Sequence, residues 1–222
     1  MSDLLPLFPL GTVLFPGMVL PLRIFEQRYR TMFARRVDDD PIFGVVLTLS
    51  GREVGDQPEV YSVGTAASLL KAVRYDDGCV DLAVRGGRRF RLLAGHWDEG
   101  YLTATIEWIE PGERSTLAGE QTRRLAEQVT QAFSAYLDAL ERTADLRIER
   151  AELTGDPVMV AFTICSLMPF DTAQRQRLLE AMSPVQLLEV LLATIRRDRD
   201  LLLATGIGGA ALDHPGSRFS AN

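Results

Sequence analysis

The sequence predicts an α+β protein in which a strand-rich half precedes a bundle of helices. Residues 4–109 hold short apolar stretches with a period of two, separated by turn residues, and this pattern is typical of antiparallel strands. Near residues 111–115 the apolar period changes to 3.6, the period of amphipathic helices. We therefore expect a strand-rich subdomain over residues 1–115, a helical subdomain over 116–203 and a flexible tail over 204–222.

Prolines indicate that the chain begins with two extended segments. In Leu4–Leu10 and Met18–Ile24 prolines alternate with apolar residues, and proline is excluded from helix interiors. Phe15–Met18, which contains a Pro-Gly pair, has the composition of a tight turn. A short helix over Glu26–Val37 is expected next, because its apolar residues recur at helical spacing.

The remaining strands are expected at short intervals, with Val60–Tyr75 forming either one long strand or two. The stretches with strand character are Ile42–Leu49, Val60–Tyr75, Cys79–Arg85, Arg89–Trp97 and Tyr101–Ile109. The turns predicted between them are the polar loop 51–59, Asp76–Gly78, Gly86–Gly87 and Asp98–Gly100. Short strands joined by short turns predict a compact antiparallel barrel or sandwich.

Four helices are predicted in the second half. The first is long, over about 117–143. Asp156 followed by Pro157 has the chemistry of an N-cap and a first helical residue, and so starts the second. The third and fourth start at capping pairs, which are Asp171 with Gln174 and Ser183 with Gln186.

Composition and charge exclude several classes of function. The 222 residues are 46% hydrophobic and 24% charged, which is ordinary for a globular protein. A net charge of −6 argues against a general affinity for nucleic acid or anionic membranes. Lys71 is the only lysine and lies outside any GxxxxGK[ST] motif, so the sequence contains no such nucleotide loop. The longest later apolar run, Val158–Met168, is too short to span a membrane, and we expect a cytoplasmic protein.

We predict no catalytic residue, no metal site and no cofactor. The two histidines, His96 and His214, belong to no HExxH motif, and no serine lies in a GxSxG elbow. Cys79 and Cys165 are far apart and lack partners at zinc spacing, so we expect them to be reduced and buried.

Two sets of residues are candidates for binding. Four arginines between residues 85 and 91 could form a basic hairpin that clamps a carboxylate or phosphate, or could simply face outward from a strand: Arg85, Arg88, Arg89 and Arg91. The apolar residues of the first 33 positions are expected to be mostly core. Some of their rings could instead form an exposed patch that contacts peptides.

The N-terminal segment resembles a known family. Leu5–Leu10, then Val13–Glu26, then Arg28 and Tyr29, are similar in order to the N-terminal substrate-binding domain of the Lon proteases, also called the ATP-dependent protease La domain. Shorter matching segments extend the resemblance over residues 4–200: Phe43–Val46, Val63–Ala67, Gly87–Leu92, Leu167–Phe170 and Gln176–Glu180.

The resemblance implies a PUA-like pseudo-β-barrel with an embedded helix, followed by a helical bundle. In full Lon proteases this domain helps to recognise unfolded or tagged polypeptides, and ATPase and Ser-Lys protease modules follow it. The 222 residues contain neither module, so the resemblance suggests a stand-alone bacterial member of the family. No catalytic residue can be carried over, because the matching region of the family has none.

The leading hypothesis is therefore a non-catalytic module that binds polypeptide or a partner protein, with a protease or chaperone ATPase as a candidate partner. We expect binding in a groove between the two halves. The candidate binding residues are Arg23, Phe25, Arg28 and Tyr29. Two alternatives stay open, a PUA-like RNA-binding module and an enzyme with a small-molecule pocket between the halves.

Overall fold

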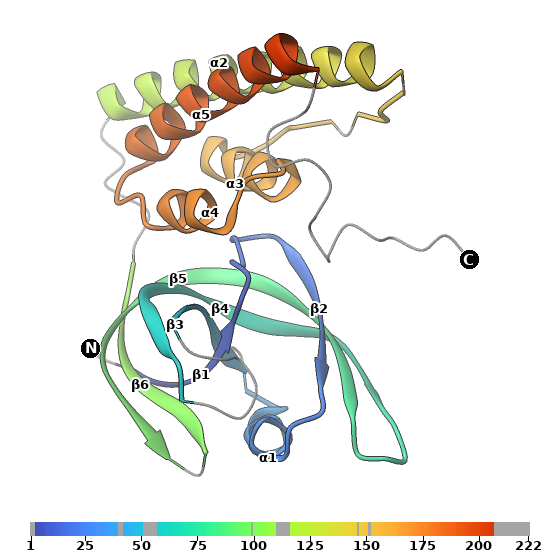
Figure 1. Cartoon of the computed structure of the whole chain (residues 1–222). Helices are drawn as coiled ribbons and strands as arrows, with labels where there is room; N and C mark the ends of the chain where they lie inside the picture. The colour runs from blue at the N-terminus through green and yellow to red at the C-terminus, as the bar shows by residue number, and fades with distance from the viewer. Residues whose placement is uncertain are drawn as a thin grey trace.

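The structure is a computed structural model in which strands form one part and helices α2–α5 lie on one side of it (Figure 1). It describes residues 3–39, 42–50, 57–98, 100–109, 116–145, 147–150 and 152–206. The strands are β1 (Asp3–Leu10), β2 (Val19–Ile24), β3 (Phe43–Ser50), β4 (Glu59–Arg74), β5 (Val80–Asp98) and β6 (Tyr101–Trp108). The helices are α1 (Gln27–Arg36), α2 (Thr116–Ala144), α3 (Pro157–Leu167), α4 (Thr172–Leu179) and α5 (Pro184–Thr205). The predicted α+β class is confirmed.

The strands form one mixed sheet that closes on itself. Their order is β2-β5-β4-β3-β1-β6, and a further pairing of β5 with β6 completes a ring. β1 and β3 are parallel, and the other pairs are antiparallel. This ring stands where the pseudo-barrel was predicted, but the prediction of a purely antiparallel arrangement was wrong, because β1 and β3 pair in parallel. β2 pairs only with β5 among the described strands, so it is an edge strand beside the ring.

The predicted turns at Phe15–Met18 and Asp76–Gly78 and the predicted helix starts are confirmed, whereas residues 51–56 and 99 of two other predicted turns lie outside the described residues. The Met18 N–H donates to the Phe15 carbonyl at 3.1 Å, and Gly17 between them has a φ of 79°. The Asp156 carboxylate caps α3. The capping pairs predicted for the last two helices are also present at α4 and α5. Val60–Tyr75 proves to be one strand, because β4 continues through two register shifts.

The prediction of a turn at Gly86–Gly87 was wrong, because β5 runs unbroken for 19 residues. A Cβ atom on Gly86 would overlap the Phe15 carbonyl oxygen. The Gly86 N–H donates to the Met18 carbonyl at 2.9 Å, and its own carbonyl accepts from Gly17 at 2.8 Å. Gly86 therefore lets the 15–18 turn approach the strand closely, which is the other common reason for glycine inside a strand.

The two halves share a hydrophobic core. One cluster of buried residues joins α2, α3 and α5 to four residues of the strand half: Val13, Phe15, Leu47 and Val63. The Phe15 and Phe162 rings stack with centroids 5.9 Å apart. A second cluster packs α1 against the ring at the end opposite the other helices (Figure 1).

Further sequence predictions concern the cysteines, membrane spans and the tail. Cys165 is buried on α3, and desolvation raises the pKa of its thiol, whereas Cys79 is only half-buried, contrary to the prediction. Both thiols are free. No described helix combines the length and hydropathy that crossing a membrane requires. The predicted tail begins inside α5, and residues 207–222 lie outside the described part of the chain.

One carboxylate is buried between the two longest helices. Asp198 on α5 is 8% exposed, and desolvation raises the pKa of its carboxyl, with a smaller raising contribution from Asp171 and an opposing one from Arg197. Its charge also adds to the raised pKa of the buried Tyr136 phenol on α2. The charged form of Asp198 therefore opposes the packing of α2 on α5.

We predict that Asp198 makes the protein less stable as the pH rises. Its folded pKa is raised, so the folded state holds the proton more tightly, and stability falls from about pH 4 upward through the folded pKa. Urea denaturation of Asp198→Asn should show higher stability than the wild type at pH 7, with the difference shrinking toward pH 4. Asp200→Asn, on the exposed side of α5, is the control and should not change the pH dependence. Equal curves for wild type and Asp198→Asn would contradict this account.

Adjacent glycines on β5 provide a second test. Gly86→Ala should destabilise the protein by about 3 kcal/mol or prevent folding, because the new methyl group meets the Phe15 carbonyl. Gly87→Ala should change stability by less than about 1 kcal/mol, since its new methyl group would have no neighbour closer than 3.5 Å. Urea midpoints of the two variants give the comparison, and similar midpoints would refute the close-approach argument.

Candidate functional site

The residues predicted to bind polypeptide lie along β2 and at the start of α1. Arg23 projects from the outer face of β2 with a side chain that is 58% exposed. Its guanidinium lies 3.8 Å from Asp81 on β5 and over the Tyr75 ring, 5.4 Å from the centroid. The Asp81 carboxylate raises the pKa of Arg23. Arg23 is thus held in place by cross-strand contacts and still reaches solvent.

Phe25 presents an apolar ring between β2 and α1. The residue is 48% exposed. Its backbone carbonyl accepts from Arg30 Nε at 2.9 Å and from Arg30 Nη2 at 2.7 Å. Arg30 also donates to the Asp77 carbonyl in the β4–β5 hairpin at 3.2 Å. The Phe25 backbone is therefore fixed, although its ring is largely uncovered.

Arg28 is enclosed by protein contacts. Its side chain is 13% exposed, and its guanidinium bonds to the Glu26 carboxylate at 3.0 Å. It also donates to the Gly100 carbonyl at 3.3 Å and lies over the rings of Tyr29 and Trp97. These contacts tie α1 to the β5–β6 connection, so the described structure gives Arg28 a role in packing.

Tyr29 is a core residue. It is 1% exposed, and its ring lies 4.2 Å from that of Phe8, centroid to centroid. Tyr29 lies on the buried face of α1 together with Met32 and Phe33. The surface exposure that a binding role requires is absent, so among the four predicted residues Arg23 and Phe25 are the accessible ones.

Sequence reasoning missed the outer face of neighbouring strands. The Tyr75 hydroxyl donates to Asp81 Oδ2 at 2.8 Å, and this bond raises the pKa of Tyr75. Lys71 and Arg85 are exposed on the same sheet. The period-two pattern was the available signal, because Asp81 and Arg85 alternate with buried Leu82 and Val84.

The expected groove between the two halves is filled by packed side chains. Arg175 is 8% exposed, and its guanidinium lies over the Phe15 ring, 5.1 Å from the centroid. The buried Gln176 side chain donates to the Val63 carbonyl at 3.1 Å. Arg89 donates to the carbonyls of Leu179 and Ala181 at 2.5 and 2.6 Å. Where these residues meet, the two halves are in close, buried contact, and the expected open groove is not present at this position.

The four arginines between 85 and 91 do not form a basic hairpin, since β5 is continuous there. Arg88 lies over the Trp108 ring, 4.5 Å from its centroid. Arg89 is directed into the contact between the halves, and burial lowers its pKa. Arg91 approaches Glu107 at 4.0 Å and the Met182 sulfur at 3.1 Å. The charges are thus directed to separate places and give little support to nucleic-acid binding.

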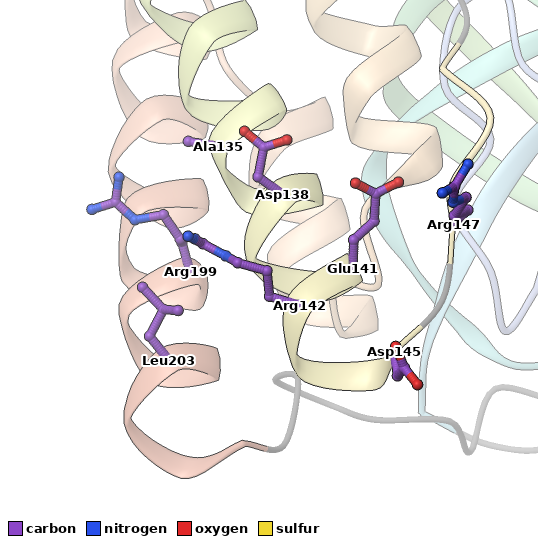
Figure 2. Close-up of a pocket in the computed structure, with 8 residues that line it drawn as sticks. All are labelled: Ala135, Asp138, Glu141, Arg142, Asp145, Arg147, Arg199 and Leu203. Carbon is purple, nitrogen blue, oxygen red and sulfur yellow. The ribbon is translucent and has the colours of Figure 1, made fainter.

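A hollow of about 730 Å³ lies between α2, the segment after it, and α5 (Figure 2). Its polar lining consists of arginines and carboxylates: Asp138, Glu141, Arg142, Asp145, Arg147 and Arg199. Arg150 beside it bonds to Asp138 at 2.5 Å and Glu141 at 2.9 Å. The charges of the two signs nearly balance, and the described lining includes no serine, cysteine or histidine, so the hollow offers little support for the enzyme alternative.

Comparison with known proteins identifies the family. The model of the ATP-dependent protease La (LON) substrate-binding domain matches residues 4–197. This chain belongs to that family. A Lon N-terminal domain protein from Xanthomonas campestris is 30% identical, with a TM-score of 0.60, and the match covers 86% of this chain and 98% of that one. The N-terminal domain of Lon protease from the Mycobacterium avium complex, at 20% identity and a TM-score of 0.59, covers 87% of this chain and 98% of that one and supports the fold.

Curated relatives are much longer than this Lon substrate-binding domain. Lon protease 1 of Syntrophobacter fumaroxidans is 28% identical over 89% of this chain and 24% of that protein. The Lon protease of Escherichia coli K12 is 26% identical over 89% of this chain and 25% of that protein. The chain thus spans about a quarter of the length of the relatives it matches.

We predict that Arg89 holds the helical half of this Lon domain on the strand ring. Arg89→Ala should cost about 2–4 kcal/mol, because it leaves two carbonyls at the end of α4 without their charged donor. Arg88→Ala, one residue away and on the opposite face, should cost about 1 kcal/mol or less. Urea unfolding measures both, and equal losses would show that the contacts of Arg89 are dispensable.

Proposed function

We propose that this chain is a non-catalytic module that binds unfolded or extended polypeptide. The observation that carries the proposal is membership of a substrate-binding domain family over residues 4–197. The relatives with curated names are Lon proteases, so we propose that bound polypeptide is delivered to an ATP-dependent protease or chaperone in the cytoplasm.

The accessible surface near β2 supports this function. Phe25 and Tyr75 are each more than 40% exposed, and the Arg23 guanidinium lies over the Tyr75 ring. Exposed apolar groups on a fixed backbone bind other apolar groups without a large ordering cost. Unfolded polypeptides present both apolar and acidic side chains, whereas folded proteins bury most of the apolar ones. A surface of this kind would therefore favour the unfolded form of a client.

The proposal predicts binding of a permanently unfolded protein. Reduced, carboxymethylated α-lactalbumin labelled with a fluorophore should bind, and the native form of the same protein should bind much less, as measured by anisotropy. Phe25→Ala and Arg23→Ala should each weaken binding by about 5-fold to 10-fold, because each removes one exposed contact group.

Leu203→Ala on α5 is the matched control, since Leu203 is 55% exposed and lies in the helical half. Its affinity should equal that of the wild type. Failure of the domain to bind any unfolded protein would refute the proposed function. Equal losses of affinity in all three variants would show that the binding surface does not lie at β2.

A further inference from the structure

We propose that β2 binds an extended acidic–apolar polypeptide segment as an additional strand of the sheet. The inference rests on the proposed function and specifies how and where the polypeptide is held. Its starting observation is that β2 has a strand neighbour, β5, on one side only among the described residues. The other edge therefore offers backbone groups to an incoming chain.

The hydrogen-bond phase shows which groups face this free edge. The Gly86 N–H donates to the Met18 carbonyl at 2.9 Å, so Met18 directs its carbonyl toward β5. In an antiparallel pair of strands, residues that bond to the neighbouring strand alternate with residues whose backbone groups point away from it. Leu20 and Leu22 therefore bond to β5, whereas Val19, Pro21 and Arg23 direct their backbone groups away from β5. The outward-directed groups are the N–H of Val19 and Arg23 and the carbonyls of Val19, Pro21 and Arg23.

The position of Pro21 is compatible with this pattern of hydrogen bonds. It lacks an N–H, and at this position the missing donor costs no hydrogen bond to β5. The free edge of β2 therefore offers two backbone N–H donors and three backbone carbonyl acceptors to a partner strand. A strand without proline would offer one more donor.

Apolar surface on the inner side of the edge is incompletely covered. Leu20 and Leu22 are half-buried at the border of the cluster that contains α1. Every second side chain of an added strand would lie over them, because side chains alternate between the two faces. Apolar residues at these alternate positions would extend the existing core.

The outer side of the edge favours acidic residues. Arg23, Arg85 and Lys71 project from β2, β5 and β4 on this face, and the register sets Arg23 opposite Asp81. Asp81 is already engaged by Arg23 and Tyr75. This face is thus locally cationic in a chain whose net charge is −6.

The charge of this outer face also indicates which kind of chain can bind at the free edge of β2. β2 has no acidic side chain, so β2 of a second copy would offer no carboxylate to Arg23, Arg85 and Lys71. An extended segment that alternates acidic and apolar residues instead matches the cations on one face and the leucines on the other. We therefore assign the edge to such a polypeptide segment.

Amide exchange of the isotopically labelled full chain tests the proposal directly. The probe is a capped peptide of about ten residues in which Glu and Val alternate. Without peptide, the Val19 and Arg23 amides should exchange quickly, and those of Leu20 and Leu22 slowly. At saturation with peptide, the Val19 and Arg23 amides should exchange at least about 10-fold more slowly.

Backbone-modified peptides separate strand addition from other contacts. If the peptide adds as an antiparallel strand, its Glu N–H groups bond to β2, so N-methylation of the Glu amides should abolish binding. If it adds as a parallel strand, its Val N–H groups make these bonds, so N-methylation of the Val amides should abolish binding. Only one of the two modified peptides should therefore fail to bind. A peptide with Lys in place of Glu should bind at least about 10-fold more weakly. Arg85→Glu should weaken binding of the Glu peptide, whereas Arg196→Glu on α5 should not.

Each outcome has a defined meaning. Peptide binding with unprotected Val19 and Arg23 amides, or equal binding of both methylated peptides, would overturn strand addition and leave the proposed function standing. Protection of these amides that grows with protein concentration alone would assign the edge to a second copy and overturn the assignment to a polypeptide. If neither the peptide nor unfolded α-lactalbumin binds, the proposed function itself fails, and the inference fails with it.

Discussion

The close approach of the 15–18 turn to Gly86 is the constraint on which the arrangement of this domain depends. Because Gly86 has no side chain, the Phe15 carbonyl can lie against the middle of β5. β5 can then continue without a turn, so its first part pairs with β2 and its later part pairs with β6 to close the ring. The same turn directs the Phe15 ring toward α3, where it stacks on Phe162. One backbone contact thus connects the edge strand, the ring and the helical half.

The arginines divide into those that hold the fold and those that reach solvent. Arg28, Arg30 and Arg89 each donate to backbone carbonyls of other segments. A planar guanidinium with several donors suits this role, because it can satisfy two carbonyls at once. Arg23 and Arg85, in contrast, project from the outer face of the β2–β5 pair. Counting basic residues along the chain therefore overestimates the positive surface.

The packed contact between the halves and the open edge of β2 have different physical consequences. A buried contact that includes Phe15, Phe162 and Arg175 stabilises one relative position of the two parts. An edge strand with free backbone groups can bind chains of varied sequence, because every residue except proline offers the same N–H and carbonyl. In the proposed function, a rigid body that carries such an edge could bind polypeptides of different sequence. The contacts that fix Phe25 and Arg23 in place would reduce the ordering cost of the proposed binding.

Local chemistry was enough to predict the class of the fold and most element boundaries. Period-two and period-3.6 patterns located the strands and helices, and the caps at Asp171 and Ser183 located helix starts, because these signals act over a few neighbouring residues. The resemblance of residues 4–200 to Lon substrate-binding domains was also visible from residue order. Of the candidate site, the sequence located the segment that holds Arg23 and Phe25.

Tertiary structure alone decided which of these residues are accessible and how the halves meet. Gly86 reads as a turn residue in sequence, and only its contact with the distant Phe15 carbonyl shows that it lies inside a strand. Burial of Tyr29, the neutralising contacts of Arg28 and the filling of the expected groove all depend on partners far along the chain. The free edge of β2 likewise follows from which strands pair, and pairing depends on long-range contacts that no local pattern contains.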